Sequence, residues 1–454
     1  MSEPTTILIA SLLLLIPHAA LGQTAFDANF DGSGKIDLLD FVEFVLAFES
    51  TQSKYDLNYS GKVDLLDFIA FVLLFDQKVK PEDCGKEVGN GLEIIQGPDG
   101  PEEADHDNAF RSLTVHPSDP EILLIGTERN GFVKSTNGGE SWTRYRGGLR
   151  HTNNGYPEVW DIAFDPIDPS NVYAATLDSP GPIIGDHPSA PAGIYKSANG
   201  GETWSRANFG LFNFRITSVQ VDPDSPNVVI IGVEGGEASF SALQGQFFDG
   251  SFYRSSDRSD TRSRVEIAEN ETKNGYWRLL AVASPQTQLI AFGFNFSETS
   301  ENLGFFRSRD SSLTWEAFAS DLQPLLITGF DVSSDGQTIY ANERNLFVLQ
   351  KSVDGGTTWS TTQTNQANGP VAVPPSDPLL VLFSGSSTLY RSTDGLQSSQ
   401  FVLDATGTIT DIVVAPSDPT IALAITEGFF LYKSTYSGAT FTLITNLRSD
   451  VLNN

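Results

Sequence analysis

One short segment recurs seven times along this chain, and its repetition constrains the fold more than any other feature. Each copy follows the pattern Ser-x-[Asp/Asn]-x-Gly-x-[Ser/Thr]-[Trp/Phe], with some copies degraded, and the first reads STNGGESW. The copies begin at Ser135, Ser197, Ser255, Ser308, Ser352, Ser392 and Ser434. Their spacing falls from 62 residues to between 40 and 44 in the later copies. Periods near 40 residues with strand patterning are typical of propeller blades with four strands each.

The residues before each copy predict what the copy connects. Segments such as LTVHPSDPEILLIGT and IAFDPIDPSNVYAAT contain a strand, a turn with Asp and Pro, and a second strand. We therefore expect each repeat to hold four strands, with the recurring segment as the hairpin turn between the third and fourth. Short polar side chains bond to the local backbone in such turns, and glycine adopts conformations that other residues avoid. We call this segment the turn motif, and expect its Trp to pack back over the turn.

The turn motif resembles the Asp-box of bacterial neuraminidase-repeat proteins. That group includes sialidases, sortilin, xyloglucanase-type glycosidases and photosystem II assembly factors. The resemblance implies a mainly β fold, with a seven-bladed propeller over residues 109–447. It says very little about function, because proteins with this propeller have unrelated activities. Motif three has Arg262 where Trp is expected. The chain enters at the first strand of repeat one and ends on the fourth strand of repeat seven, so no strand exchange that closes the ring is evident.

A second repeat lies near the N-terminus, where NFDGSGKIDLLDFVEFVLAF and DLNYSGKVDLLDFIAFVLLF align at an offset of 27 residues. Each copy fits a twelve-residue calcium loop, with oxygen ligands at positions 1, 3, 5, 9 and 12 and a glycine at position 6. The first loop offers Asn29, Asp31, Ser33, Asp37 and Asp40, and the second offers Asp56, Asn58, Ser60, Asp64 and Asp67. Apolar residues at helical spacing follow each loop. We expect a small all-α EF-hand pair over residues 25–77 that binds two calcium ions.

The paired loops resemble a dockerin, the calcium domain of bacterial extracellular glycan-degrading systems. The DLLDF sequence that opens each helix and the Asp at position 12 fit that family. Dockerins attach enzymes to cohesins on a scaffold, so the resemblance implies a cohesin-like partner. Family members often carry this module at the C-terminus, whereas it is N-terminal here. The alternative interpretation is therefore a calcium domain with a purely structural role.

The composition of the chain indicates which class of partner it disfavours and in which compartment the protein is found. With 28 Lys and Arg against 57 Asp and Glu, the net charge is −29, which opposes nucleic-acid binding because that binding neutralises phosphates with basic residues. Residues 1–22 read as a signal peptide, with an apolar core too short to span a bilayer, and no later stretch could span one. Residues 78–108 read as a linker and contain Cys84, the one cysteine of the chain. These features predict a secreted, extracellular protein.

The first repeat intervals are longer than the later ones, which predicts long loops on the face where propellers usually bind ligands. The connection after motif one brings Arg144, Arg146, Arg150, His151, Tyr156 and Trp160 into one stretch of an acidic chain, and Asp186 with His187 lies in a long loop of repeat two. Aromatic rings beside Arg and carboxylates suit a glycan groove. We therefore predict ligand-binding roles for Glu128, Arg150, Tyr156 and Trp160. The alternative is that these arginines form surface ion pairs, which stabilise little.

Two functions remain open at this stage. The first is a binding module for a glycan or protein partner, and the second is a xyloglucanase-like glycoside hydrolase acting on polysaccharide. The resemblance to xyloglucanases places one catalytic acid at Glu128, but Glu234, Glu343 and Glu427 stand at similar positions in other repeats. That recurrence favours a structural role, so no catalytic residue is assigned and binding is preferred over catalysis.

Overall fold

The computed structural model describes residues 110–446 with internal gaps, together with Phe41, Val45 and Phe68. The gaps are residues 129, 150–155, 178–191, 209–210, 212–214, 235, 238–246, 249–250, 261, 266–275, 283–287, 295–303, 320–321, 323–326, 344 and 363–365. The predicted signal peptide and linker lie outside the described residues, as does the calcium pair apart from those three positions.

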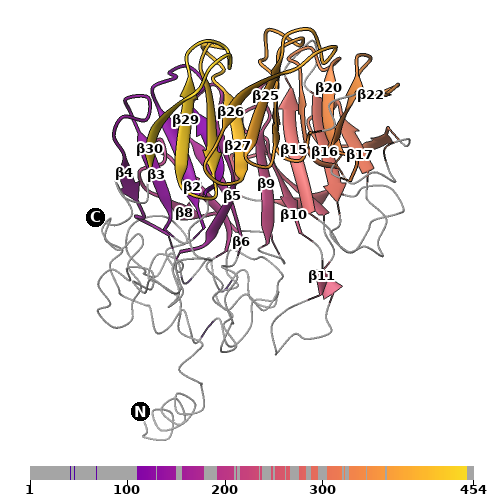
Figure 1. The fold of residues 1–454 in the computed structure, drawn as a ribbon. Helices are drawn as coiled ribbons and strands as arrows, with labels where there is room; N and C mark the ends of the chain where they lie inside the picture. The colour runs from indigo at the N-terminus through magenta and orange to yellow at the C-terminus, as the bar shows by residue number, and fades with distance from the viewer. Residues whose placement is uncertain are drawn as a thin grey trace, which may run out of the picture. The chain divides into compact units, whose positions relative to one another are not determined.

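The described chain from residue 110 onward folds into seven four-stranded antiparallel sheets that follow one another along the sequence (Figure 1), and a two-stranded ribbon interrupts the third. Sheet 1 holds β1 (Phe110–Val115), β2 (Leu123–Thr127), β3 (Phe132–Ser135) and β4 (Thr143–Tyr145). Sheet 2 holds β5 (Glu158–Phe164), β6 (Val172–Leu177), β7 (Gly193–Ser197) and β8 (Ser205–Arg206). Sheet 3 holds β9 (Ile216–Val221), β10 (Val229–Val233), β13 (Ser251–Ser255) and β14 (Ser263–Val265), and β11 (Gly236–Glu237) and β12 (Phe247–Phe248) form a separate two-stranded ribbon.

The remaining sheets follow the same order. Sheet 4 holds β15 (Tyr276–Val282), β16 (Gln288–Phe294), β17 (Gly304–Ser308) and β18 (Glu316–Phe318). Sheet 5 holds β19 (Ile327–Val332), β20 (Ile339–Glu343), β21 (Val348–Ser352) and β22 (Ser360–Thr361). Sheet 6 holds β23 (Val371–Ala372), β24 (Val381–Gly385), β25 (Thr388–Ser392) and β26 (Gln400–Asp404). Sheet 7 holds β27 (Ile409–Val414), β28 (Ala422–Thr426), β29 (Phe430–Ser434) and β30 (Thr442–Asn446).

The second strand of most sheets is buried along its whole length. The sequences LLIGT in β2, VYAATL in β6 and VIIGV in β10 have every side chain buried. A strand that is covered on both faces needs a continuous apolar run rather than an alternating one. The neighbouring sheets supply that cover, because apolar side chains of adjacent sheets share clusters such as the one joining sheets 2 and 3.

Every turn motif links the third and fourth strands of one sheet, as predicted, and its first serine organises the turn. In motif one the Ser135 hydroxyl accepts the Gly139 amide at 2.9 Å and donates to Asn137 Oδ1 at 2.9 Å. The Asn137 side chain in turn accepts the Ser141 amide at 2.9 Å. The same bonds recur with Asp in place of Asn in motif five, from Ser352 and Asp354. The serine and the acid or amide two residues later are therefore structural, as expected.

The motif tryptophans differ in how far they are buried. Trp204 is 2% exposed, but Trp142 and Trp359 are half-buried and pack at the edge of their apolar clusters. The indole N–H of each half-buried residue donates back to its own turn, to the Gly139 and Gly356 carbonyls at 2.9 and 3.0 Å. The expected packing of the tryptophan back over its own turn is thus observed for Trp142 and Trp359.

The sheets close into a ring through their first strands. Each first strand contacts the first strand of the next sheet, and β27 of sheet 7 contacts β1 of sheet 1. One apolar cluster contains side chains from both the first and the last sheets, which lie beside each other in Figure 1. The Leu113 amide also donates to Asp411 Oδ2 at 3.0 Å across this junction. The mainly β propeller is confirmed, and its ring closes without exchange of strands among the described residues.

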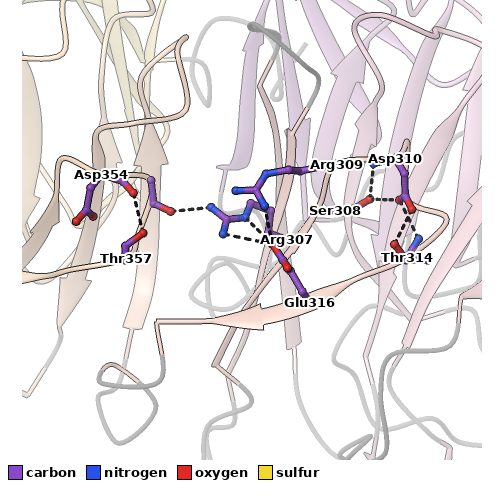
Figure 2. Close-up of polar contacts among 9 residues, drawn as sticks. Arg307, Ser308, Arg309, Asp310, Thr314, Glu316, Asp354 and Thr357 are labelled. Atoms are coloured by element: carbon purple, nitrogen blue, oxygen red, sulfur yellow. Dashed lines mark hydrogen bonds and ion pairs between the residues drawn. The ribbon is translucent and has the colours of Figure 1, made fainter.

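A basic residue directly before the motif serine fastens each sheet to the next. At five of the seven junctions, its side chain donates a hydrogen bond to the backbone carbonyl of the fourth motif residue in the following sheet. The five donor and acceptor pairs are Arg254 with Ser311, Arg307 with Gly355, Lys351 with Gly395, Arg391 with Ser437, and Lys433 with Gly138. In the other two, Lys134 and Lys196 form ion pairs with Glu202 and Asp260. Figure 2 shows the Arg307 contact beside the motif of its own sheet. The Lys433 contact joins sheet 7 to sheet 1, so it takes part in closing the ring.

Candidate functional site

The antiparallel order of each sheet decides which residues share a face. The start of the first strand, the end of the second, the start of the third and the end of the fourth all lie at one end of a sheet. We call this end of the ring the loop face. Glu128 directly follows β2 and Glu234 directly follows β10, while Tyr156 stands two residues before the start of β5. All three residues therefore belong to the loop face, on sheets 1 to 3.

Arg146 is the best-defined polar residue on this face. It follows β4, and its Nε donates to the Asn130 carbonyl at 3.0 Å while its Nη2 donates to Asn130 Oδ1 at 2.6 Å. Its guanidinium lies over the Tyr156 ring, 4.8 Å from the centroid. Tyr156 packs in turn against an apolar cluster that contains the buried Leu149. Residues from two sheets thus hold one guanidinium in a fixed orientation.

A second arginine reinforces the positive charge. Burial lowers the pKa of Arg146 to about 10, with a further contribution from neighbouring Arg144, against an opposing effect of Tyr156. Burial also lowers the pKa of Arg144, again opposed by Tyr156. Both groups stay charged at neutral pH, in a chain whose net charge is −29. A planar guanidinium held in place can bind a carboxylate or a sugar hydroxyl through paired hydrogen bonds. We call Arg144, Arg146 and Tyr156 the arginine cluster.

The glutamates at the ends of the second strands have structural contacts. Glu234 accepts from Arg215, with Oε2 at 2.8 Å from Nη2 and 2.9 Å from Nε. The Glu343 carboxylate, 1% exposed, accepts the Asn345 and Leu346 amides at 3.0 and 2.6 Å and so caps its own turn. Glu128 is only 4% exposed. A hydrolase needs two carboxylates facing a sugar, whereas Glu234 and Glu343 stabilise the loops that carry them.

The structure places the remaining predicted residues unevenly. Trp160 is the third residue of β5 and half-buried, so it lies in a strand rather than in the connecting loop. Arg150, His151, Asp186 and His187 lie outside the described residues, and so do all ten predicted calcium ligands. No group of three or more His, Cys, Asp or Glu that could hold a metal occurs within the described part of the chain.

Sequence reasoning missed Asn130, which contributes both oxygen atoms that position Arg146. It is 8% exposed and sits in the tight turn between β2 and β3, where the Asn130 amide donates to Thr127 Oγ1 at 2.8 Å. The adjacent Gly131 has a φ of 77°, a conformation that side chains other than glycine rarely adopt. The Asn-Gly pair at 130–131 is a sequence pattern that predicts a turn. The contact of Asn130 with Arg146, however, joins residues 16 positions apart and depends on the pairing of β3 with β4.

Comparisons with known proteins show the fold and not a family. No protein-family description and no curated protein matches the sequence. Among solved structures, YCF48 bound to a D1 peptide superposes with a TM-score of 0.51 at 13% identity, over 76% of this chain and 97% of that one. YCF48 from Cyanidioschyzon merolae gives 0.49 at 14% identity, over 73% and 94%. A GH74 xyloglucanase from Xanthomonas campestris gives 0.33 at 14% identity, over 74% and 64%. The first likeness supports a propeller fold.

No helix in the described ranges is long and apolar enough to cross a membrane.

Proposed function

We propose that this protein is a secreted, calcium-binding modular protein whose Asp-box propeller binds a glycan or protein partner through its loop face. The orientation of Arg146 by Asn130 and Tyr156 is the observation that supports the proposal most. A guanidinium fixed by neutral groups presents its charge to a ligand, whereas one fixed by a carboxylate would be neutralised. The peptide bound by one propeller of similar fold is in keeping with a binding role.

The preferred ligand carries an acidic group. Arg144 and Arg146 repel each other, which contributes to the lowered pKa of Arg146, so an anion between them would relieve that repulsion. Charge-assisted hydrogen bonds to a carboxylate are roughly twice as strong as those between neutral groups. The aromatic ring of Tyr156 adds a flat surface for a sugar or a peptide side chain.

The binding role is tested with the full chain on immobilised polysaccharides, with polygalacturonate as the acidic probe and xyloglucan as the neutral one. An acidic peptide immobilised in the same way represents protein partners. We expect Arg146→Gln and Tyr156→Ala to reduce retention at least tenfold on the probe that binds. Arg309→Gln is the matched control, because Arg309 is an exposed arginine paired with Glu316 at 2.7 Å. Equal retention of Arg146→Gln and wild type would refute this site.

The alternative, a xyloglucanase-like glycoside hydrolase, is distinguished in the same experiment by reducing-sugar release. Under that alternative, Glu128→Gln abolishes release and leaves retention intact. The structural contacts of Glu234 and Glu343 weigh against it. We therefore keep binding as the conclusion.

The N-terminal module is proposed to be a dockerin-like calcium pair that docks to a cohesin-like scaffold protein. Phe41 and Phe68 occupy equivalent positions in the two loop repeats, 27 residues apart, and their rings lie 6.4 Å apart. Equivalent residues in contact are what two related halves around a shared core would produce. Calcium titration of the full chain by calorimetry tests this proposal, and a stoichiometry below two ions would contradict it.

A further inference from the structure

The third turn motif differs from the others at a position that the fold fills with an aromatic ring. Its last residue is Arg262, where five of the seven motifs have Trp or Phe, namely Trp142, Trp204, Trp315, Trp359 and Phe441. In three of them the Trp lies against a Phe of the preceding sheet. These pairs are Trp204 with Phe132, Trp315 with Phe252 and Trp359 with Phe305, with ring centroids 4.0, 4.6 and 5.7 Å apart. The third motif places a cation at this kind of interface instead.

Arg262 is buried there with only part of its hydrogen-bonding capacity used. Arg262 is 8% exposed to solvent. Nη1 donates to the Ala207 carbonyl of sheet 2, while Nε and Nη2 are buried and have no hydrogen-bond partner among the described residues. Burial lowers the pKa of Arg262 to about 9, so the group still carries its charge at neutral pH. A buried charge of this kind is costly unless a counter-charge accompanies it.

The two carboxylates that act electrostatically on Arg262 are engaged with other groups. Asp260 forms an ion pair with Lys196 at 3.0 Å, and Asp257 accepts the Ser255 hydroxyl at 2.6 Å. Neither forms a hydrogen bond or an ion pair with Arg262 among the described residues, although both influence its charge through space. Within the described part of the chain, no carboxylate therefore bonds directly to Arg262 Nε or Nη2.

A buried hydroxyl group accompanies the arginine. Tyr173 of β6 is fully buried, and its hydroxyl has no hydrogen-bond partner in the part of the chain that the structure describes. Tyr173 and Arg262 interact electrostatically, and Ala207 packs against the apolar cluster that contains Tyr173. Tyr340 stands at the same place in sheet 5, paired with the basic residue before the motif serine, and its hydroxyl donates to the Pro378 carbonyl at 2.9 Å. The Tyr173 hydroxyl thus lacks the hydrogen bond that the hydroxyl of Tyr340 makes.

We propose that a small monovalent anion, chloride under physiological conditions, binds between sheets 2 and 3 and accepts hydrogen bonds from Arg262 Nε, Arg262 Nη2 and the Tyr173 hydroxyl. Burial raises the pKa of Tyr173, so its hydroxyl stays protonated and can donate. Water would satisfy the donors but would add no negative charge to the through-space effect of Asp257 and Asp260 on Arg262.

The test uses thermal unfolding of the full chain at constant ionic strength, with sodium chloride replacing sodium gluconate. We expect the Tm of the wild type to rise by about 1–3 °C and to saturate, as for a ligand that binds only the folded state. Arg262→Trp restores the residue of other motifs and should abolish the chloride dependence. Arg262→Met serves the same purpose if the tryptophan variant does not fold. Arg309→Gln, which removes an exposed arginine, should keep the full chloride effect.

Crystals soaked in bromide provide an independent readout. We expect an anomalous peak next to Arg262 and Tyr173 in the wild type and none in Arg262→Trp. A wild-type Tm that does not depend on chloride would overturn the proposal and indicate bound water. An Arg262→Trp variant with the wild-type chloride response would overturn it too, as would bromide that binds only at crystal concentrations without an effect on Tm.

Discussion

Replacing Trp204 by alanine should be the most costly single substitution among the motif tryptophans. Trp204 is 2% exposed, and its ring stacks on the ring of Phe132, with the two centroids 4.0 Å apart and an interplanar angle of 17°. A buried Trp removes about 200 Å² of mostly apolar surface from water, which corresponds to about 5 kcal/mol at ~25 cal/mol per Å². Measured Trp→Ala costs in cores are about 3–5 kcal/mol. We therefore expect Trp204→Ala to lose about 4–5 kcal/mol.

Trp359 provides the matched comparison because it occupies the same motif position but is only half-buried. Its ring lies 5.7 Å from that of Phe305, so Trp359→Ala should cost less, about 2–3 kcal/mol. Tyr436, 71% exposed in motif seven, is a surface control expected to change stability by less than ~0.5 kcal/mol. Urea unfolding followed by far-UV circular dichroism measures all three. If Trp204→Ala cost no more than Trp359→Ala, burial between sheets would not be what sets the role of this position.

Three further outcomes follow from the same contacts and from the calcium loops. Lys433→Met should lower stability by ~1–2 kcal/mol in urea unfolding, because it removes the charged hydrogen bond of 3.1 Å to the Gly138 carbonyl that joins the last sheet to the first. Amide and hydroxyl donors from the same turn lower the pKa of Asp354 to about 2, so its stabilising effect is complete above about pH 4. That effect is lost as the pH falls through about 2, and Asp354→Asn should flatten the Tm profile in this acid range. Asp67→Ala should weaken calcium binding to the full chain more than Ser60→Ala in calorimetry, because position 12 of the loop normally supplies two oxygens; equal effects would contradict the proposed register.

The local part of this fold could be predicted because it is written in adjacent residues. The serine and the acid or amide two positions later bond to amides within four residues of the serine, as in Ser135 and Asn137. Such contacts need no knowledge of the neighbouring sheet. The degree of burial of each motif tryptophan does need it, because a Phe of the preceding sheet covers the ring, as in the pairs of Trp204 with Phe132 and Trp315 with Phe252.

The contacts between sheets explain why ring closure was not predicted. All seven motif serines follow a lysine or arginine, yet the partner of each basic residue lies tens of residues away, or 295 residues away for Lys433 and Gly138. The basic residue was visible in every repeat, but its role becomes apparent only when the next turn is placed against it. The same distance effect hid Asn130, whose bond to Arg146 depends on the pairing of strands.

In a repeat protein, a residue that departs from the repeat is more informative about function than one that conforms to it. Glu128 and Glu234 each directly follow the second strand of a sheet and Glu343 ends another second strand, and the latter two have contacts that stabilise their own loops. Arg146 and Arg262 do not recur, and each places a buried or half-buried charge where the fold alone would not require one. Because such charges lower stability unless something compensates them, their presence calls for a ligand. This reasoning favours an anion at both places, a partner on the loop face at Arg146 and an internal ion at Arg262.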